Sequence, residues 1–311
     1  MNNMIITVQN LKKSFKDTHV LKGVSFTVKR GSIFALLGSN GAGKTTTVKI
    51  LSTLINADSG HIKIDGINIK NVKKVREKIS LTGQYAAVDE GLTGKENMQM
   101  ICALRDVNNR KKRTEDLLLQ FDLLKAADRK VSTYSGGMRR KLDIAMSLIG
   151  NPSIVFLDEP TTGLDPQSRL ALWDTIKLMS DSGITIFLTT QYLEEAERLA
   201  DYITILNKGT VAAAGTVGEL KKHMPRGVID LRFKDFSQIK QVEELLKEYN
   251  PRVDNESNAL SIATGEGIDQ ITDILIRLQS SNIHVASFEQ KLPTLEDVFL
   301  GLINEKEMSA S

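Results

Sequence analysis

A glycine-rich segment followed by lysine and threonine is the strongest chemical signal in the sequence. Residues 38–45 read Gly-Ser-Asn-Gly-Ala-Gly-Lys-Thr and match the pattern G-x-x-x-x-G-K-S/T. Glycines let a backbone curl so that successive N–H groups point at phosphate oxygens. Lys44 would then reach the β- and γ-phosphates, and Thr45 would offer its hydroxyl to Mg²⁺. A glycine turn with an unused lysine is the alternative. The predicted phosphate-binding residues are Gly38, Ser39, Asn40, Gly41, Ala42, Gly43, Lys44, Thr45 and Thr46.

Two acidic residues end an apolar run further along the chain. Residues 154–159 read Ile-Val-Phe-Leu-Asp-Glu. A buried strand would place both acids at its carboxyl end, the edge where α/β sheets bind ligands. Asp158 is the expected ligand of Mg²⁺, because a hard cation prefers oxygen. Glu159 is predicted to orient and activate the attacking water. Alone, the two acids could equally be turn residues.

A serine–glycine cluster lies between these two motifs and precedes a predicted long helix. Residues 132–140 read Ser-Thr-Tyr-Ser-Gly-Gly-Met-Arg-Arg. The cluster offers a hydroxyl, bare backbone N–H groups and a helix N-terminus, all of which suit phosphate. With this third motif the chain resembles the ABC ATPases over about residues 1–220. The family signature is typically Leu-Ser-Gly-Gly-Gln, and here Tyr134 and Met138 replace its first and last residues.

The resemblance implies that Ser135, Gly136 and Gly137 serve the glycine loop of a partner subunit. Two copies would therefore pair head to tail with two ATP molecules between them. It also implies that Phe15 stacks on adenine, although a core phenylalanine is the alternative. Gln84, in Leu-Thr-Gly-Gln-Tyr, matches the family glutamine that contacts Mg²⁺ and the attacking water. Asp165, after Pro-Thr-Thr-Gly-Leu, matches the loop that bonds across the dimer.

One position departs from the family pattern. Residues 189–196 read Thr-Thr-Gln-Tyr-Leu-Glu-Glu-Ala, so Gln191 stands where the family usually has a switch histidine. A glutamine amide can donate a hydrogen bond to the γ-phosphate but cannot carry a positive charge. A mechanism with a protonated switch residue is therefore not expected. The predicted catalytic residues are Glu159, Gln191, Gln84 and Lys44, and the predicted metal ligands are Thr45, Gln84 and Asp158.

Three stretches resemble the daunorubicin-type drug-resistance ATPases in particular. They are the residues around Gln191, residues 82–94, and residues 292–299, which read Leu-Pro-Thr-Leu-Glu-Asp-Val-Phe. The resemblance implies an exporter subunit for amphipathic antibiotics, held at the cytoplasmic face of the membrane by separate permease chains. Residues 85–98 would meet the permease's cytoplasmic helix.

Short apolar strands alternating with helical stretches must position these residues, which predicts an α/β fold. Near-continuous apolar composition predicts buried parallel strands at 33–37, 154–157 and 184–189. Strands at 5–8, 24–28 and 60–65 are expected to form an antiparallel layer, with a hairpin turn at Asp65-Gly66. We expect helices at 44–53 and over most of 94–148, the latter opened by a capping box at Thr93–Glu96. A final hairpin is expected at 202–214. Together with this pattern, the resemblance implies the fold class of a P-loop ABC-type ATPase domain, with a parallel-sheet core, an antiparallel β layer and a helical subdomain at about 85–150.

The pattern changes near residue 225, which predicts domains at 1–225 and 226–311. The second reads strand 228–233, helix 236–248, strands within 252–263, helix 267–280 and strand 283–290, followed by a short helix at 295–303. This β-α-β-β-α-β order predicts a ferredoxin-like α+β domain, dimerising or regulatory in role.

The bulk composition limits the function further. The 311 residues contain one cysteine, Cys102, no apolar run long enough to span a bilayer and no signal segment, so a cytoplasmic location is expected. Residues 226–311 carry 9 Lys+Arg and 15 Asp+Glu, a balance of −6, which leaves 32 − 23 = +9 for residues 1–225. A basic N-terminal part suits a nucleotide, an anionic membrane surface or nucleic acid.

Soluble ABC ATPases of translation or DNA repair usually have two cassettes or a long coiled coil, and this chain shows neither, so we expect no nucleic acid partner. A non-hydrolysing regulatory module is the third alternative, against which Glu159 argues.

Overall fold

The computed structural model describes residues 3–222, 227–233, 238–254, 259–264, 268–291 and 294–300. The chain forms two compact units, Met1–Val217 and Gly218–Ser311, and each is described by itself. The predicted boundary at 225/226 stays a prediction. No helix in the described ranges is both long and apolar enough to cross a bilayer.

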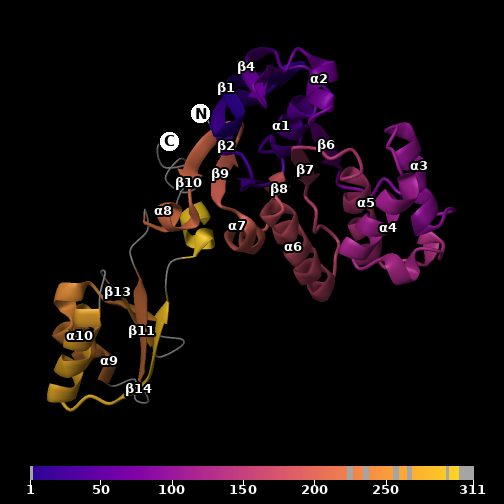
Figure 1. The fold of residues 1–311 in the computed structure, drawn as a ribbon. Coiled ribbons are helices and arrows are strands. Elements are labelled where there is room, and N and C mark those ends of the chain that lie inside the picture. The colour runs from indigo at the N-terminus through magenta and orange to yellow at the C-terminus, as the bar shows by residue number, and fades with distance from the viewer. Residues whose placement is uncertain are drawn as a thin grey trace. The chain divides into compact units, whose positions relative to one another are not determined.

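A six-stranded sheet forms the centre of the first unit (Figure 1). Its order is β10-β9-β3-β8-β7-β6, and all neighbours are parallel except β9 and β10. All residues of β3, β7 and β8 are buried, and apart from Asp158 and the three threonines of β8 they are apolar, as burial on both faces of a sheet favours. The predicted parallel core is therefore confirmed. The strands are β3 (Ile33–Leu37), β6 (Ile79–Thr82), β7 (Ile154–Asp158), β8 (Thr185–Thr190), β9 (Tyr202–Asn207) and β10 (Thr210–Gly215).

The predicted antiparallel layer is also present, in the order β2-β1-β4-β5. Its strands are β1 (Met4–Phe15), β2 (Thr18–Lys29), β4 (Ser59–Ile64) and β5 (Ile67–Asn68). Asp65 and Gly66 have φ values of 50° and 75°, as the expected tight hairpin turn requires. Apolar side chains fill the space between this layer and the six-stranded sheet. Phe26 of β2 stacks on Phe34 of β3, with ring centroids 5.1 Å apart.

The helices of the first unit follow from local signals. Thr93 and Glu96 form the expected capping box at the start of α3. Helices α3, α4 and α5 gather beside β6, at one end of the six-stranded sheet (Figure 1). The helices are α1 (Lys44–Leu51), α2 (Val72–Arg76), α3 (Gly94–Leu104), α4 (Arg110–Gln120), α5 (Gly136–Ser147), α6 (Pro166–Asp181) and α7 (Leu193–Leu199), with short 3-10 turns at Leu124–Ala126 and Val131–Thr133. Helix α8 (Val217–Lys221) begins at the boundary between the two units.

The second unit contains the expected β-α-β-β-α-β order. Its sheet runs β12-β13-β11-β14 with every neighbour antiparallel, as in a ferredoxin-like fold. Its own apolar core includes Leu231, Val242 and Ile274. The elements are β11 (Val228–Phe233), α9 (Ile239–Leu245), a 3-10 turn (Lys247–Tyr249), β12 (Arg252–Asp254), β13 (Ala259–Ala263), α10 (Ile268–Ser280) and β14 (Val285–Lys291). Residues 295–300 are helical, and the rest of the predicted terminal helix lies outside the described residues.

Candidate nucleotide site

The glycine loop joins β3 to α1, and its glycines are needed for two different reasons. Gly41 and Gly43 have φ values of 80° and 109°, a backbone region that other residues rarely adopt. Gly38 has an ordinary φ, but a Cβ there would overlap the carbonyl oxygen of Leu206 in β9. The loop is therefore shaped by its own turn and by close packing against the neighbouring strand. The N-terminus of α1, which begins at Lys44, opens directly from it.

Lys44 is buried at the base of this loop. Its side chain is only 4% exposed, so its charge needs partners. The ammonium donates to the carbonyl oxygens of Gly38, at 2.8 Å, and Ser39, at 3.2 Å. It also lies 3.3 Å from Oε1 of Glu159. The loop lysine and the acid at the end of β7 thus belong to one site.

Asp158 and Thr45 bring two oxygen donors together, as Mg²⁺ requires. Thr45 Oγ1 lies 3.4 Å from Asp158 Oδ1. Asp158 Oδ1 also accepts a hydrogen bond of 2.5 Å from the buried hydroxyl of Thr189. Among the described residues, no group of three or more His, Cys, Asp or Glu is arranged so that it could hold a metal ion. A sparse set of this kind fits Mg²⁺ held jointly with phosphate oxygens, because Mg²⁺ uses few protein ligands in such sites.

Glu159 has an unusual backbone conformation. Its φ is 48°, which is uncommon for a residue other than glycine and is often retained at functional sites. Its N–H points back to Thr189, 3.1 Å from both the carbonyl and the hydroxyl oxygen. This turn directs its carboxylate to Lys44 and, at 3.4 Å, to the Nε2 of Gln84. Thr162 Oγ1 is 3.5 Å from the same carboxylate.

Gln84 and Gln191 are placed differently. Gln84 follows β6, is exposed, and joins the site through Glu159. Gln191 follows β8 and is partly buried, and its amide makes no hydrogen bond with the part of the chain that the structure describes. The turn that carries it is fixed by the N–H of Tyr192, which donates to Thr190 Oγ1 at 2.9 Å.

The serine–glycine cluster begins α5. Ser135 caps the helix by accepting from the N–H of Met138 at 3.2 Å. Ser135 and Gly136 are exposed, whereas a Cβ on Gly137 would come within 2.6 Å of Ser168 Oγ in the same chain. Between the described residues, no hydrogen bond or ion pair joins the cluster to the glycine loop. The structure therefore does not bring these two predicted phosphate-binding motifs together within one chain.

Phe15 and Asp165 complete the predicted set. Phe15 is 48% exposed at the end of β1, with the ammonium of Lys13 5.3 Å from its ring centroid, so it is not a core residue. Asp165 is exposed and caps α6 by accepting from the N–H of Ser168 at 2.9 Å. Hydrogen bonds from the Ser168 hydroxyl and then from its N–H lower the pKa of the Asp165 carboxyl. Its carboxylate therefore has a role within its own chain.

Sequence reasoning missed the buried polar residues behind the site. Thr189 bonds to both Asp158 and Glu159, and the only sequence signal was a pair of threonines in an apolar strand. Glu195 is fully buried, which raises the pKa of its carboxyl. Its Oε1 accepts from Thr161 Oγ1 at 2.8 Å and from Trp173 Nε1 at 2.9 Å. Glu195 thus connects α7, which follows Gln191, to the segment after Glu159.

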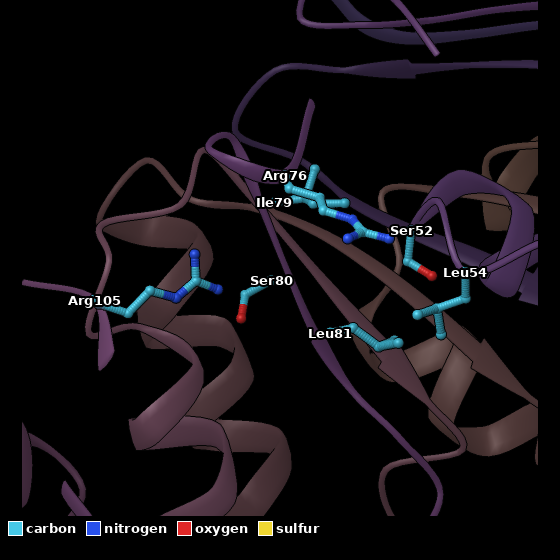
Figure 2. A pocket seen from close by; sticks show the side chains of 7 residues that line it. All are labelled: Ser52, Leu54, Arg76, Ile79, Ser80, Leu81 and Arg105. Atoms are coloured by element: carbon cyan, nitrogen blue, oxygen red, sulfur yellow. The ribbon is translucent and has the colours of Figure 1, made fainter. Parts of the chain in front are cut away.

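A cleft of about 410 Å³ lies along β6, and no residue of the nucleotide motifs lines it (Figure 2). Arg105 reaches into it from the end of α3, and Arg76 lies on the other side of the strand, where it donates to Thr53 Oγ1 at 2.8 Å. No acidic residue lines the cleft. Its floor and wall include Leu54, Ile79, Ser80 and Leu81.

The chain matches known proteins over almost its whole length. Residues 21–162 match the family model described as "ABC transporter", and residues 215–303 match the "ATP-binding protein DrrA1-3-like, C-terminal domain". The daunorubicin resistance ATP-binding protein DrrA3 of Streptomyces coeruleorubidus is 39% identical over 308 residues, 98% of each chain. The daunorubicin/doxorubicin resistance ATP-binding protein DrrA of Streptomyces peucetius is 40% identical over 96% of this chain and 92% of that protein.

A solved structure shows the same fold in a hydrolysing cassette. It is a dimeric post-hydrolysis state of an ATP-binding cassette bound to ADP and Pi, with a TM-score of 0.62 and 25% identity. The similarity covers 68% of this chain and 98% of that one. With an intact glycine loop and paired acids, this chain is accordingly an ATP hydrolase. It belongs to the ATP-binding subunits of ABC transporters, in the group of DrrA-like ATP-binding proteins.

Proposed function

We propose that two copies of this chain pair head to tail around two ATP molecules and drive separate permease subunits that export amphipathic antibiotics. The observation that carries this proposal is the convergence of Lys44, Asp158, Glu159 and Gln84 on one edge of the six-stranded sheet. Ser135 and Gly136 are exposed, and between the described residues no hydrogen bond or ion pair joins them to Lys44, Asp158, Glu159 or Gln84, which supports their use by a second copy.

Each residue of the site has a distinct proposed role. Lys44 neutralises phosphate oxygens, and its buried position strengthens that interaction because the site excludes water. Thr45, Asp158 and Gln84 would hold Mg²⁺, which when bound offsets negative charge on the phosphates. Glu159 accepts a proton from the attacking water and orients it, and Gln191 donates an amide hydrogen bond to the γ-phosphate. Phe15, exposed at the end of β1, stacks on the adenine.

The proposed permease contact is the cleft along β6 that Arg76 and Arg105 line, together with Tyr85. Tyr85 follows Gln84 and is 85% exposed. Two guanidinium groups without a lining carboxylate suit an acidic side chain, and the leucine and isoleucine walls suit apolar neighbours. The proposed occupant is a short cytoplasmic segment of the permease that carries one carboxylate between apolar residues. This contact would hold the chain at the cytoplasmic face of the membrane.

The alternative functions receive less support. A regulatory module without hydrolysis would not need Glu159 held by Thr189 in a strained backbone conformation beside Gln84 and Lys44. A nucleic-acid-directed ATPase would need a binding surface beyond the nucleotide site. We therefore retain the exporter subunit.

The experiment that tests the exporter assignment is purification of the tagged chain from its own membranes in detergent, with identification of the proteins that accompany it. A polytopic membrane protein is expected in stoichiometric amount. Recovery with ribosomes or nucleic acid instead would overturn the assignment.

Charge reversal tests the docking site. Arg105→Glu should reduce recovery of the permease and its stimulation of ATP hydrolysis, while hydrolysis by the chain alone stays unchanged. Arg110→Glu is the matched control, because Arg110 is exposed on α4 and does not line the cleft. Equal effects of the two substitutions would remove the cleft from the proposal.

The C-terminal domain is proposed to dimerise or regulate the subunits. Its separate apolar core predicts that a chain ending near residue 225 still folds and binds ATP, because every phosphate-binding motif lies earlier. ATP titration of the shortened chain measures this. Loss of binding in a chain that is folded by circular dichroism would mean that the proposed boundary is wrong.

A further inference from the structure

Two charged residues of α5 are buried, one at the basic run 139–141 and the other among apolar residues. Arg140 is 4% exposed and Asp143 is 6% exposed. They lie one turn apart, with Nη1 of the arginine 3.4 Å from Oδ2 of the aspartate. Burial raises the pKa of the Asp143 carboxyl to about 6 and lowers that of the Arg140 guanidinium. Burying a charged group costs free energy unless hydrogen bonds and an ion pair offset the loss of water, so the contacts of these two side chains indicate what they stabilise.

Arg140 bonds to the backbone of two separate loops. Its Nη1 donates to the carbonyl oxygen of Gly83 at 2.6 Å, in the residue just before Gln84. Its Nε donates to Pro160 O at 2.9 Å, and its Nη2 lies 3.4 Å from Asp158 O. These two carbonyls flank Glu159. One planar guanidinium therefore spans the ends of β6 and β7, which a lysine could not do in the same way.

Asp143 fixes the other end of the Gln84 segment. Its Oδ1 accepts from the N–H of Ala87 at 3.2 Å, while Oδ2 faces Arg140. Gly83 and Ala87 bracket Gln84 and Tyr85, so both ends of this exposed segment are attached to the same turn of α5. The N-terminus of that helix is the Ser135 cluster.

We propose that Arg140 and Asp143 form a clamp that holds the Gln84 segment in register with Glu159 and links both to α5. Neither side chain contacts the glycine loop that is predicted to bind phosphate. Arg140 and Asp143 therefore hold the catalytic residues in position and do not take part in the reaction themselves. Contacts between the Gln84 segment and a permease, which rest on the proposed function, would be carried to Glu159 through the same bonds.

The clamp predicts a loss of turnover without a loss of ATP affinity. In Arg140→Met and Asp143→Leu, kcat should fall by about 10–100-fold, as for a displaced catalytic group. The dissociation constant for a non-hydrolysable ATP analogue should change by no more than about twofold, because the substitutions leave the contacts of the glycine loop with ATP in place. Asp143→Asn should retain most activity, since its carboxamide oxygen can still accept from Ala87 N–H. Lys141→Met is the matched control on the same helix, and it should behave as the parent.

A spectroscopic measurement separates positioning from general damage. Tyr85→Trp places a reporter in the Gln84 segment, and the signal of Trp173, the chain's one tryptophan, is subtracted using the parent. Adding Arg140→Met or Asp143→Leu should lower the fluorescence anisotropy of the reporter, and adding Asp143→Asn should not. An unchanged anisotropy in both disruptive variants would overturn the clamp, as would ATP affinity falling in step with kcat.

Both measurements use the chain without a permease. These measurements can therefore contradict the clamp while the exporter assignment stands. Conversely, the absence of a permease among the co-purified proteins would contradict the exporter assignment and would not affect the clamp. If one disruptive variant does not fold, the other, together with the conservative Arg140→Lys, gives the same test. The lysine variant should be intermediate in kcat, since one ammonium cannot bridge both loops; parental kcat and anisotropy in all folded variants would overturn the proposal.

Discussion

The ammonium of Lys44 lies 3.3 Å from the carboxylate of Glu159, so the phosphate-binding lysine and the proposed base share one buried site. The same carboxylate lies 3.4 Å from Gln84. Removing either charge leaves the other short of a partner. We therefore expect a substitution of Glu159 to affect turnover and a substitution of Lys44 to affect both ATP binding and turnover. Each substitution should also change the electrostatic environment of the other residue.

Glu159→Gln should keep ATP binding and abolish most turnover. The water loses its base, which typically contributes about 10²–10⁴-fold, while the phosphate contacts survive. With ATP and Mg²⁺ the variant should accumulate as a dimer on gel filtration. A variant that stays monomeric, or that hydrolyses ATP at the parental rate, would contradict the role of Glu159.

Lys44→Ala should weaken both binding and turnover. It removes a cation that also neutralises Glu159, so part of the loss should come from a largely buried carboxylate left without a counter-ion. Titration with ATP and steady-state hydrolysis measure the two effects. Lys44→Ala combined with Glu159→Gln should regain some thermal stability relative to Lys44→Ala alone, and equal stabilities would argue against the coupling.

The composite site is best tested at Gly136. A carboxylate at either signature glycine would face phosphate, but at Gly137 a Cβ would first meet Ser168 in the same chain. A Cβ on Gly136 meets only Leu164 Cδ2, at 3.7 Å, which is ordinary contact. Gly136→Glu should thus abolish hydrolysis without unfolding.

A mixture of Gly136→Glu and Lys44→Ala chains provides the control for site sharing. In a head-to-tail mixed dimer one site carries both defects and the other carries neither, so partial hydrolysis should return. Activity no higher than in either variant alone would mean that the two sites do not work independently.

The limits of sequence reasoning are visible at particular residues. The buried strands and the glycine loop could be predicted because their signals are local: apolar runs, glycine spacing and a capping box at Thr93. Arg140 could not, because it lies in a run of basic residues that is typical of a solvated helix face. Its burial depends on backbone carbonyls from two loops distant in sequence. Asp143, inside the apolar run Leu142–Met146, was the one available hint of a buried charged pair.

Glu159 illustrates the same limit at the level of the backbone. Its identity was predicted from its place after an apolar strand, but its positive φ depends on Thr189 in the neighbouring strand. The capping role of Asp165 could in principle have been predicted, since proline follows it at the first position of α6.

Asp143 predicts a pH dependence of stability. Its folded pKa of about 6 exceeds the ordinary value of 3.8, so between these values the folded chain binds more protons than the unfolded chain. The contribution of Asp143 to the free energy of unfolding is therefore fully present below about pH 4 and is lost as the pH rises through 6. The loss is up to about 3 kcal/mol, because the folded and unfolded pKa values differ by roughly two units. Asp143→Asn should remove this component.

Urea unfolding followed by Trp173 fluorescence at pH 4.5 to 7.5 measures this difference. The free energy of unfolding of the parent, relative to Asp143→Asn, should fall with rising pH. Parallel pH curves for the two proteins would mean that Asp143 titrates normally.

Gln191 provides the last prediction, because it departs from the family's usual histidine. It follows β8 at the edge that carries Asp158 and Glu159, and its amide is not engaged by the residues that the structure describes. A donor that stabilises charge in the transition state is worth about 10²–10³ in rate, so Gln191→Ala should reduce turnover by that order with little change in ATP affinity. Gln191→His should remain active and acquire a pH dependence between about 6 and 7.5 that the parent lacks, since imidazole titrates there and an amide does not. ATPase rates of the three proteins against pH measure both effects. Parental turnover in the alanine variant would mean that Gln191 is a solvent-facing residue at a strand end and never contacts the phosphate.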